Sequence, residues 1–160
     1  MDINGYYMAA VPDPVVAKDS VKPAPVRMNE VAAERYFNAG VLYINLERVK
    51  EKGSMKNEVL DYLIKNPNAQ LLDQDALNSI YRDGILFLDS SWNYYARFVR
   101  INGENCLERK IYHYVGTSYT LYYQNEMDRL YYETVSRTPW GRKQGRKIID
   151  DSIGKLVDRS

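Results

Sequence analysis

The sequence predicts an α/β domain in which a mixed sheet is flanked by helices. Three longer segments repeat apolar residues at the spacing of one helix face, at 54–67, 74–84 and 124–137. Four shorter runs have the length and apolar content of strands, at 5–11, 41–46, 85–89 and 110–116. Strands and helices that alternate along a chain are typical of α/β proteins.

Length and charge narrow the class of protein. The 160 residues fit one domain, and the 22 basic and 21 acidic residues leave a formal net charge of +1. This balance gives no indication of a nucleic-acid partner. Cys106 is the single cysteine, so an intramolecular disulfide is excluded and a reducing cytoplasm is the expected compartment. No run approaches eighteen apolar residues, and we expect neither a signal peptide nor a spanning helix.

The first half of the chain begins with the strand at 5–11. The segment 12–26 contains four prolines and no periodicity, so it reads as an unusually long loop. A short helix is expected over 28–37, before the strand at 41–46. Ser54 has the position of an N-cap for the next helix, and Pro67 ends it. The residues expected on the buried face of that helix are Met55, Val59, Leu60, Leu63 and Ile64.

The next helix has its apolar stripe at Ala76, Leu77, Ile80 and Tyr81, and Gly84 marks its end. After the strand at 85–89 we expect an extended segment over 92–99, a turn at 102–105 and the strand at 110–116. The helix over 124–137 is expected to turn four residues inward, Met127, Leu130, Tyr131 and Thr134.

The tail over 141–160 forms a separate region. A basic cluster, Arg142, Lys143, Arg146 and Lys147, precedes apolar residues at helical spacing. One interpretation is an amphipathic helix that lies on the inner face of the plasma membrane, with its cations near anionic headgroups. The other is a helix packed on its own domain.

The segment Asp73-Gln74-Asp75 looks at first like a pair of metal-binding carboxylates. Two residues on a helix differ by about 200° of rotation, so the carboxylates would point apart and could not share one cation. The local interpretation is that Asp73 caps the helix and Asp75 favours the positive end of the helix dipole. This interpretation leaves Gln74 unexplained.

Three further residues could take part in chemistry. His113 is the only histidine, so it cannot form a histidine pair around a metal, and a single strand histidine is more often structural. Gly116 follows a strand, where it would allow either a tight turn or the close approach of a phosphate. Asn38 would hydrogen-bond a sugar or make an Asx turn.

Three segments, taken in order, carry a family resemblance: YFNAGVLYINLERVK at 36–50, LLDQDALN at 71–78 and IYHYVG at 111–116. They resemble family 8 glycosyltransferases, which are retaining, UDP-sugar-dependent enzymes of the GT-A fold. The family includes bacterial galactosyl- and glucosyltransferases that build lipopolysaccharide and other surface glycans. The resemblance extends from about Asp2 to Trp140, which gives a family 8 region over 1–140 followed by the tail.

The resemblance implies a role for each polar residue. Asn38 and Ala39 would line the donor-sugar site. Asp73 would hydrogen-bond the transferred sugar, and Gln74 would lie beside its reacting carbon. A neutral amide at that place fits attack from the front face better than a covalent enzyme intermediate.

The resemblance also implies a divalent metal. His113 would be a ligand of Mn²⁺, and Gly116 would offer its backbone to the pyrophosphate. The donor would be UDP-galactose or UDP-glucose, and the acceptor a glycan or lipid-linked sugar. The family follows its H-Y-x-G segment with Lys-Pro-Trp, whereas this chain continues TSYTLYY and has no lysine until Lys143.

One family segment has no counterpart in this chain. The uridine-binding half of the family fold ends in a D-x-D pair that holds the metal, so the resemblance implies an incomplete GT-A fold that would be inactive alone. Sheet edges that this half would pair are expected to be open, and self-association follows from that. The alternative function is a non-catalytic sugar- or partner-binding module derived from a glycosyltransferase.

Overall fold

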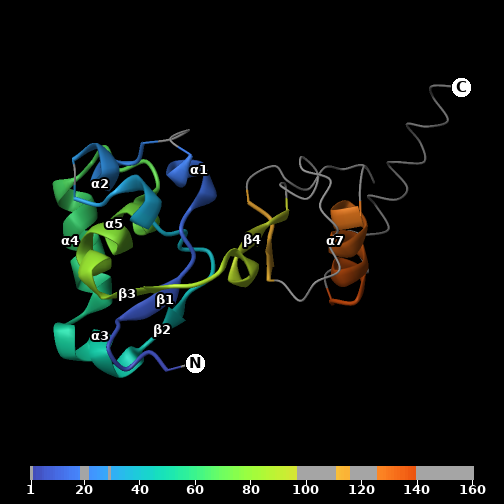
Figure 1. Cartoon of the computed structure of the whole chain (residues 1–160), viewed down its shortest axis with the longest axis horizontal. Coiled ribbons are helices and arrows are strands. Elements are labelled where there is room, and N and C mark those ends of the chain that lie inside the picture. The colour runs from blue at the N-terminus through green and yellow to red at the C-terminus, as the bar shows by residue number, and fades with distance from the viewer. Residues whose placement is uncertain (1, 19–21, 29, 97–110, 116–125, 140–160) are drawn as a thin grey trace, which may run out of the picture. The chain divides into compact units, whose positions relative to one another are not determined.

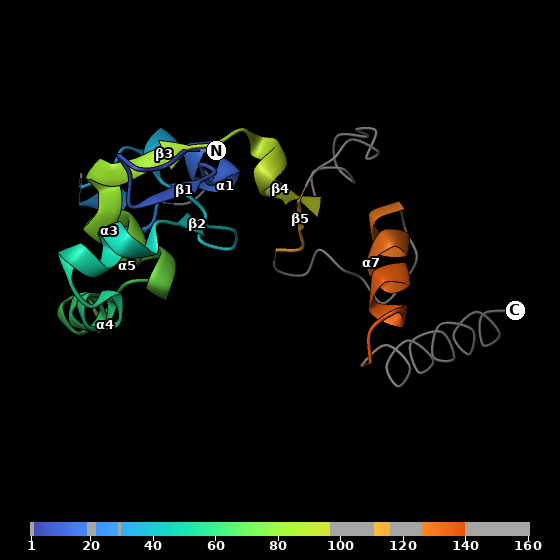
Figure 2. The same cartoon turned by 90° about the horizontal axis from the view of Figure 1, so that it is seen from below.

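The computed structural model describes residues 2–18, 22–28, 30–96, 111–115 and 126–139. The chain divides into two units, Met1–Tyr94 and Tyr95–Ser160, and each is described by itself. Figures 1 and 2 show the elements of each unit. Within the described ranges, no helix is both long and apolar enough to cross a membrane.

The first unit is built around a three-stranded mixed sheet with β1 in the centre. Strand β1 (Met8–Ala10) pairs antiparallel with β2 (Tyr43–Ile44) and parallel with β3 (Ile85–Phe87). All three residues of β1 are buried, as expected for a central strand. The predicted strands at 5–11, 41–46 and 85–89 are therefore confirmed, each over fewer residues, and so is the α/β class.

Figures 1 and 2 show helices beside this sheet. Two of these helices were predicted from the sequence. Helix α4 (Met55–Lys65) begins as expected after Ser54, whose hydroxyl accepts from the Asn57 backbone N–H. Helix α5 (Leu72–Tyr81) follows, and the 3₁₀ turn Arg82–Gly84 ends it at the predicted glycine. Helix α3 (Leu46–Lys52) was not predicted; it begins after Asn45, whose side chain accepts from the Arg48 N–H.

The segments before β2 were predicted wrongly. The supposed loop at 12–26 contains two short helices, α1 (Pro14–Ala17) and α2 (Ala24–Arg27). The expected helix over 28–37 is reduced to a 3₁₀ turn at Ala33–Arg35. The backbone of the next two residues is extended because it pairs elsewhere: the Asp13 N–H donates to the Tyr36 carbonyl at 2.7 Å, and Phe37 forms a bridge with Pro12.

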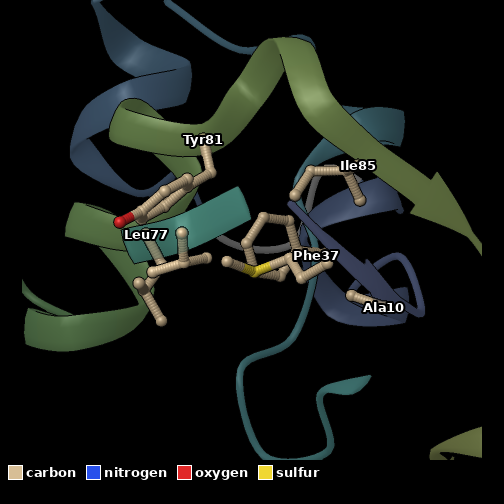
Figure 3. Close-up of a cluster of buried hydrophobic side chains, with 7 residues drawn as sticks. Ala10, Phe37, Leu77, Tyr81 and Ile85 are labelled. Atoms are coloured by element: carbon tan, nitrogen blue, oxygen red, sulfur yellow. The ribbon is translucent and has the colours of Figure 1, made fainter. Parts of the chain in front are cut away.

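The core lies between β1, β3, α3 and α5. Leu77 and Tyr81 of α5 share one buried cluster with Ala10, Phe37 and Ile85, and Figure 3 shows these side chains. The stripe predicted for α5 is confirmed at Ala76, Leu77 and Tyr81, which are buried, while Ile80 is half-buried against this core.

The buried face of α4 is only partly as predicted. Met55 and Val59 pack on the core, and Tyr62 is buried. Leu60 and Ile64 are 47% and 77% exposed, which contradicts the predicted face. The inward residues Met55, Val59 and Tyr62 are spaced at i, i+4 and i+7. The helix therefore turns a different face to the core than the one that contains Leu60 and Ile64.

Beyond the three-stranded sheet and its helices, the described residues contain a two-stranded sheet and one further helix. Strand β4 (Tyr94–Tyr95) pairs with β5 (Tyr112–His113), which confirms parts of the extended segments predicted at 92–99 and 110–116. The predicted turn at 102–105 and the tail over 141–160 lie outside the described residues, as does 97–99.

Helix α7 (Glu126–Ser136) confirms the helix predicted over 124–137. Its buried face differs from the prediction, because Leu130 and Thr134 are exposed while Asp128 and Tyr132 are buried with Met127. Because Asp128 is polar, an apolar pattern could not place it on the buried face. The face of this helix was therefore predicted wrongly.

Three tyrosines of the first unit should resist alkaline ionisation. Burial raises the pKa of Tyr62 to about 12, and burial with a hydrogen bond to Asp75 raises the pKa of Tyr36 well above its ordinary range. Burial and the Glu58 carboxylate likewise raise the pKa of Tyr81. Each folded pKa lies above the unfolded value, so the stabilisation is complete below pH about 10 and is lost as pH rises through the folded pKa. Tyrosinate absorbance should therefore include a late phase, to which at least these three groups contribute, together with the loss of helical circular dichroism. Ionisation of all tyrosines before that loss would contradict this expectation.

Candidate functional site

Four polar side chains meet beyond the carboxyl end of β1, and all four are buried. Asp13 follows the strand, Asn38 precedes β2, Gln74 lies in the first turn of α5, and Asn93 comes after β3. Their exposed fractions are 5%, 6%, 9% and 2%. The structure thus brings together three of the predicted site residues, Asn38, Ala39 and Gln74.

Gln74 connects the segment before β2 to Asp13. Its Oε1 accepts from Asn38 Nδ2 and from the Ala39 backbone N–H, each at 2.9 Å. Its Nε2 donates to Asp13 Oδ2 at 3.3 Å. The amide therefore joins a helix, a loop and a carboxylate that lie far apart in the sequence.

Asn38 uses all four of its side-chain hydrogen-bonding positions. Nδ2 donates to Gln74 Oε1 and, at 3.2 Å, to Asp13 Oδ2. Oδ1 accepts from the Gly40 N–H and from Asn93 Nδ2, each at 2.9 Å. Of the two interpretations offered by the sequence, the local turn through Gly40 is present in this structure.

Asp13 holds the start of α1 as well as the two amides. Its Oδ1 accepts from the Val15 and Val16 backbone N–H groups at 2.9 and 3.3 Å, which makes it the N-cap of that helix. The carboxylate thus receives donors on both oxygens. This arrangement compensates for the desolvation of a buried carboxylate.

Two further residues of α5 hold the segment 36–37 in place. Asp75 Oδ1 accepts from the Tyr36 hydroxyl at 2.6 Å, and its Oδ2 accepts from the Leu71 N–H at 3.2 Å. Asn78 accepts from the Phe37 N–H and donates to the Phe37 carbonyl, both at 2.8 Å. The backbone of Asn38 and Ala39 is consequently fixed relative to the helix that carries Gln74.

The two carboxylates of the Asp-Gln-Asp segment point to different surroundings, as the helix rotation predicted. Asp75 is fully buried, whereas Asp73 is exposed. The expectation that Asp73 caps α5 is wrong, because the helix begins at Leu72, its N-cap position is Leu71 and Asp73 lies within its first turn. Leu72 has φ +40°, a left-handed conformation that is unusual for leucine, so the backbone is strained where the helix begins.

His113 and Gly116 belong to the second unit. His113 is half-buried in β5, and its ring meets the Tyr95 ring edge-on at 5.7 Å between centroids. Gly116 lies outside the described residues. No group of three or more His, Cys, Asp or Glu residues able to hold a metal gathers in the part of the chain that the structure describes.

Two members of the site, Asp13 and Asn93, were not predicted from the sequence. Asp13 had a usable signal, because it lies between two prolines shortly after an apolar strand. Asn93 had none, since only the fold brings it to a residue 55 positions earlier.

Solved structures with the same fold are glycosyltransferases of the GT-A type. The galactosyltransferase LgtC, solved with donor and acceptor sugar analogs, is 18% identical with a TM-score of 0.65, and the match covers 92% of this chain and 58% of that one. The bifunctional glycosyltransferase WbbM is 20% identical with a TM-score of 0.68, covering 96% and 31% of the two chains. GlyE of Streptococcus pneumoniae TIGR4 is 21% identical with a TM-score of 0.61, covering 98% and 38%.

The family follows from the sequence match. The model of glycosyl transferase family 8 matches residues 1–118, and the chain belongs to this family. A Haemophilus influenzae protein that carries a glycosyltransferase name is 32% identical over 95 residues, which is 59% of this chain and 28% of that protein. The chain therefore spans 28% of this relative and between 31% and 58% of the three solved structures.

Proposed function

We propose that this chain supplies the sugar-transfer part of a family 8 glycosyltransferase that moves a hexose from a UDP-sugar to a glycan or lipid-linked acceptor, with retention of the anomeric configuration. The observation that carries the proposal is the buried network of Asp13, Asn38 and Gln74 beyond β1. Asp73, adjacent to Gln74 in the sequence, is exposed in the first turn of α5. Ligands of α/β proteins commonly bind beyond the carboxyl ends of the strands.

The residues present suggest a division of labour at this site. Asp73 has a solvent-facing carboxylate on the first turn of α5, one residue from Gln74. It would accept hydrogen bonds from hydroxyls of the transferred sugar. The buried network that contains Gln74 has little freedom to move, and such preorganisation favours a transition state that develops charge.

Family 8 glycosyltransferases generally use a divalent metal, and Mn²⁺ is the metal that we propose. The described residues do not form such a site by themselves, since no three ligands gather among them. His113 is the one residue that the family resemblance assigns to the metal. The remaining protein ligands would come from a family segment that this chain does not span.

The test compares two polypeptides, the 160-residue chain and the product of the whole reading frame that contains it. Each is incubated with UDP-galactose or UDP-glucose and Mn²⁺, and release of UDP is followed. We expect turnover from a polypeptide that includes the family's D-x-D segment and none from the chain alone. NMR of the product should show the anomeric configuration of the donor. An inverted product, or no turnover with either sugar, would contradict the proposal.

Replacing Asp73 by alanine should lower kcat/KM for the UDP-sugar by about ten- to a hundredfold, because a hydrogen bond to a charged group contributes about 1.5–3 kcal/mol. The unfolding temperature should be unchanged, since Asp73 is exposed and does not cap α5. Asp61→Ala, the same change at an exposed residue of α4, is the matched control. Equal activity of both variants would remove Asp73 from the site.

A further inference from the structure

The orientation of the Gln74 amide is decided by the backbone of Ala39. A backbone N–H can only donate, so the atom of Gln74 that lies 2.9 Å from the Ala39 nitrogen has to be the oxygen. The other end of the amide lies 3.3 Å from an Asp13 carboxylate oxygen, which can only accept while the carboxylate is ionised. Both neighbours therefore demand the same orientation, with nitrogen toward Asp13 and oxygen toward Ala39.

The amide of Asn38 is fixed by the same reasoning. Its Oδ1 receives the Gly40 backbone N–H, so Nδ2 has to be the atom that faces Gln74 Oε1. Gln74 Oε1 thus has two donors, Asn38 Nδ2 and the Ala39 N–H, on its two lone pairs. The carbonyl oxygen of Gln74 retains no lone pair for the reacting carbon of a sugar.

We propose that Gln74 is a positioning residue of the transfer site, whose carbonyl oxygen is committed to Asn38 and Ala39 and whose amide nitrogen orients the Asp13 carboxylate. This inference rests on the proposed function, and it differs from the role that the family resemblance suggested beside the reacting carbon. The amide acts through the groups it holds. Asn38 shares this role, because its own side chain is fully used in the network.

The decisive change is Gln74→Glu, which keeps the shape of the side chain and replaces the nitrogen by an oxygen. One carboxylate oxygen can still accept from Asn38 and Ala39. The other would face the Asp13 carboxylate at close range, so two like charges meet in a buried place. If the carbonyl oxygen were instead the working group, this change would preserve it.

The first measurement needs no activity and uses the 160-residue chain. Gln74→Glu should lower the unfolding temperature by at least about 5 °C at neutral pH. The loss should diminish as pH falls, because a protonated glutamate can again donate to Asp13. The titratable groups that face residue 74 are Asp13 from the N-cap of α1 and Tyr36 from the segment before β2, with Asp75 and Asp73 adjacent on α5.

Two further variants serve as controls for this stability measurement. Gln70→Glu places the same charge at an exposed position just before α5, where the helix dipole favours it, and should leave the unfolding temperature unchanged. Adding Asp13→Asn to Gln74→Glu exchanges amide and carboxylate, and should recover at least about half of the lost temperature at neutral pH. Wild-type stability of Gln74→Glu at neutral pH would overturn the inference.

The second measurement follows UDP release from UDP-galactose and UDP-glucose by the whole reading-frame product. Gln74→Glu should reduce turnover at neutral pH by about a hundredfold and regain part of it toward acid pH, a profile that loss of folding alone would not give under conditions where the variant remains folded. Undiminished turnover at neutral pH would overturn the inference. Absence of turnover in the wild type would refute the proposed function instead. The unfolding temperatures would still decide how the Gln74 amide is oriented.

Discussion

An Asn78→Ala variant is expected to lose about 3–5 kcal/mol of unfolding free energy, the range for a buried polar residue that serves several partners. Asn78 is fully buried and makes three hydrogen bonds, two to the backbone of Phe37 and one to the Gln74 carbonyl. Alanine would leave the Phe37 N–H and carbonyl buried without the Asn78 side chain as partner and would open a cavity beside them. Urea-induced unfolding followed by circular dichroism measures the loss.

Asn57→Ala is the matched control for this change. Asn57 is exposed on α4, and only its backbone N–H takes part in the cap by Ser54. Alanine is the better helix former, so this variant should equal or slightly exceed the wild type in stability. A loss below about 1 kcal/mol for Asn78→Ala would show that the segment before β2 is held by other contacts.

A Gly84→Ala variant is expected to lose about 2–3 kcal/mol because the new methyl group would overlap a tyrosine ring. A Cβ at this position would overlap Tyr7 Cδ2. The ring has little room to retreat, since it packs edge-on against Tyr81 at 5.3 Å and the Arg48 guanidinium lies over it at 5.0 Å. The backbone is also tied at this place, because the Tyr7 N–H donates to the Gly84 carbonyl at 2.8 Å.

The cause of this loss can be separated by a double-mutant cycle. Gly84 does not have a positive φ, so the expected loss comes from the neighbouring ring. In a Tyr7→Ala background, Gly84→Ala should cost little, and the coupling energy should account for most of the single-variant loss. Gly5→Ala adds a methyl group where no atom lies within 4 Å and should be neutral by comparison. An unchanged cost in the Tyr7→Ala background would place the strain elsewhere.

Local chemistry predicted those features that depend on neighbouring residues. The Ser54 cap and the separation of Asp73 from Asp75 both follow from helix geometry, and both are confirmed. The strands at 5–11 and 85–89 were visible because central strands are apolar throughout. The predicted self-association stays a prediction. The structure adds that Tyr43 of β2 is 52% exposed at an outer strand of this three-stranded sheet.

Tertiary contacts decided the features that the sequence analysis predicted wrongly. The segment 28–37 has helical periodicity, but Asn78 and Asp13 bind the backbone of its last two residues and keep them extended. The assignment of Asn38 and Gln74 to one site came from a family resemblance, and the structure brings them to hydrogen-bonding distance. Their bond spans 36 residues, a separation that no local pattern reveals.

The buried polar network also has a consequence for how the chain folds during synthesis. Its hydrogen bonds join residues 25, 55 and 61 positions apart, and Asn93 is its last member to be made. A partly satisfied buried network is more costly than none, so the early segments gain little by closing on each other alone. Loop closures of this length also slow the search for native contacts. We therefore expect the first unit to remain unfolded on the ribosome until Asn93 has emerged. It should then fold in one cooperative step.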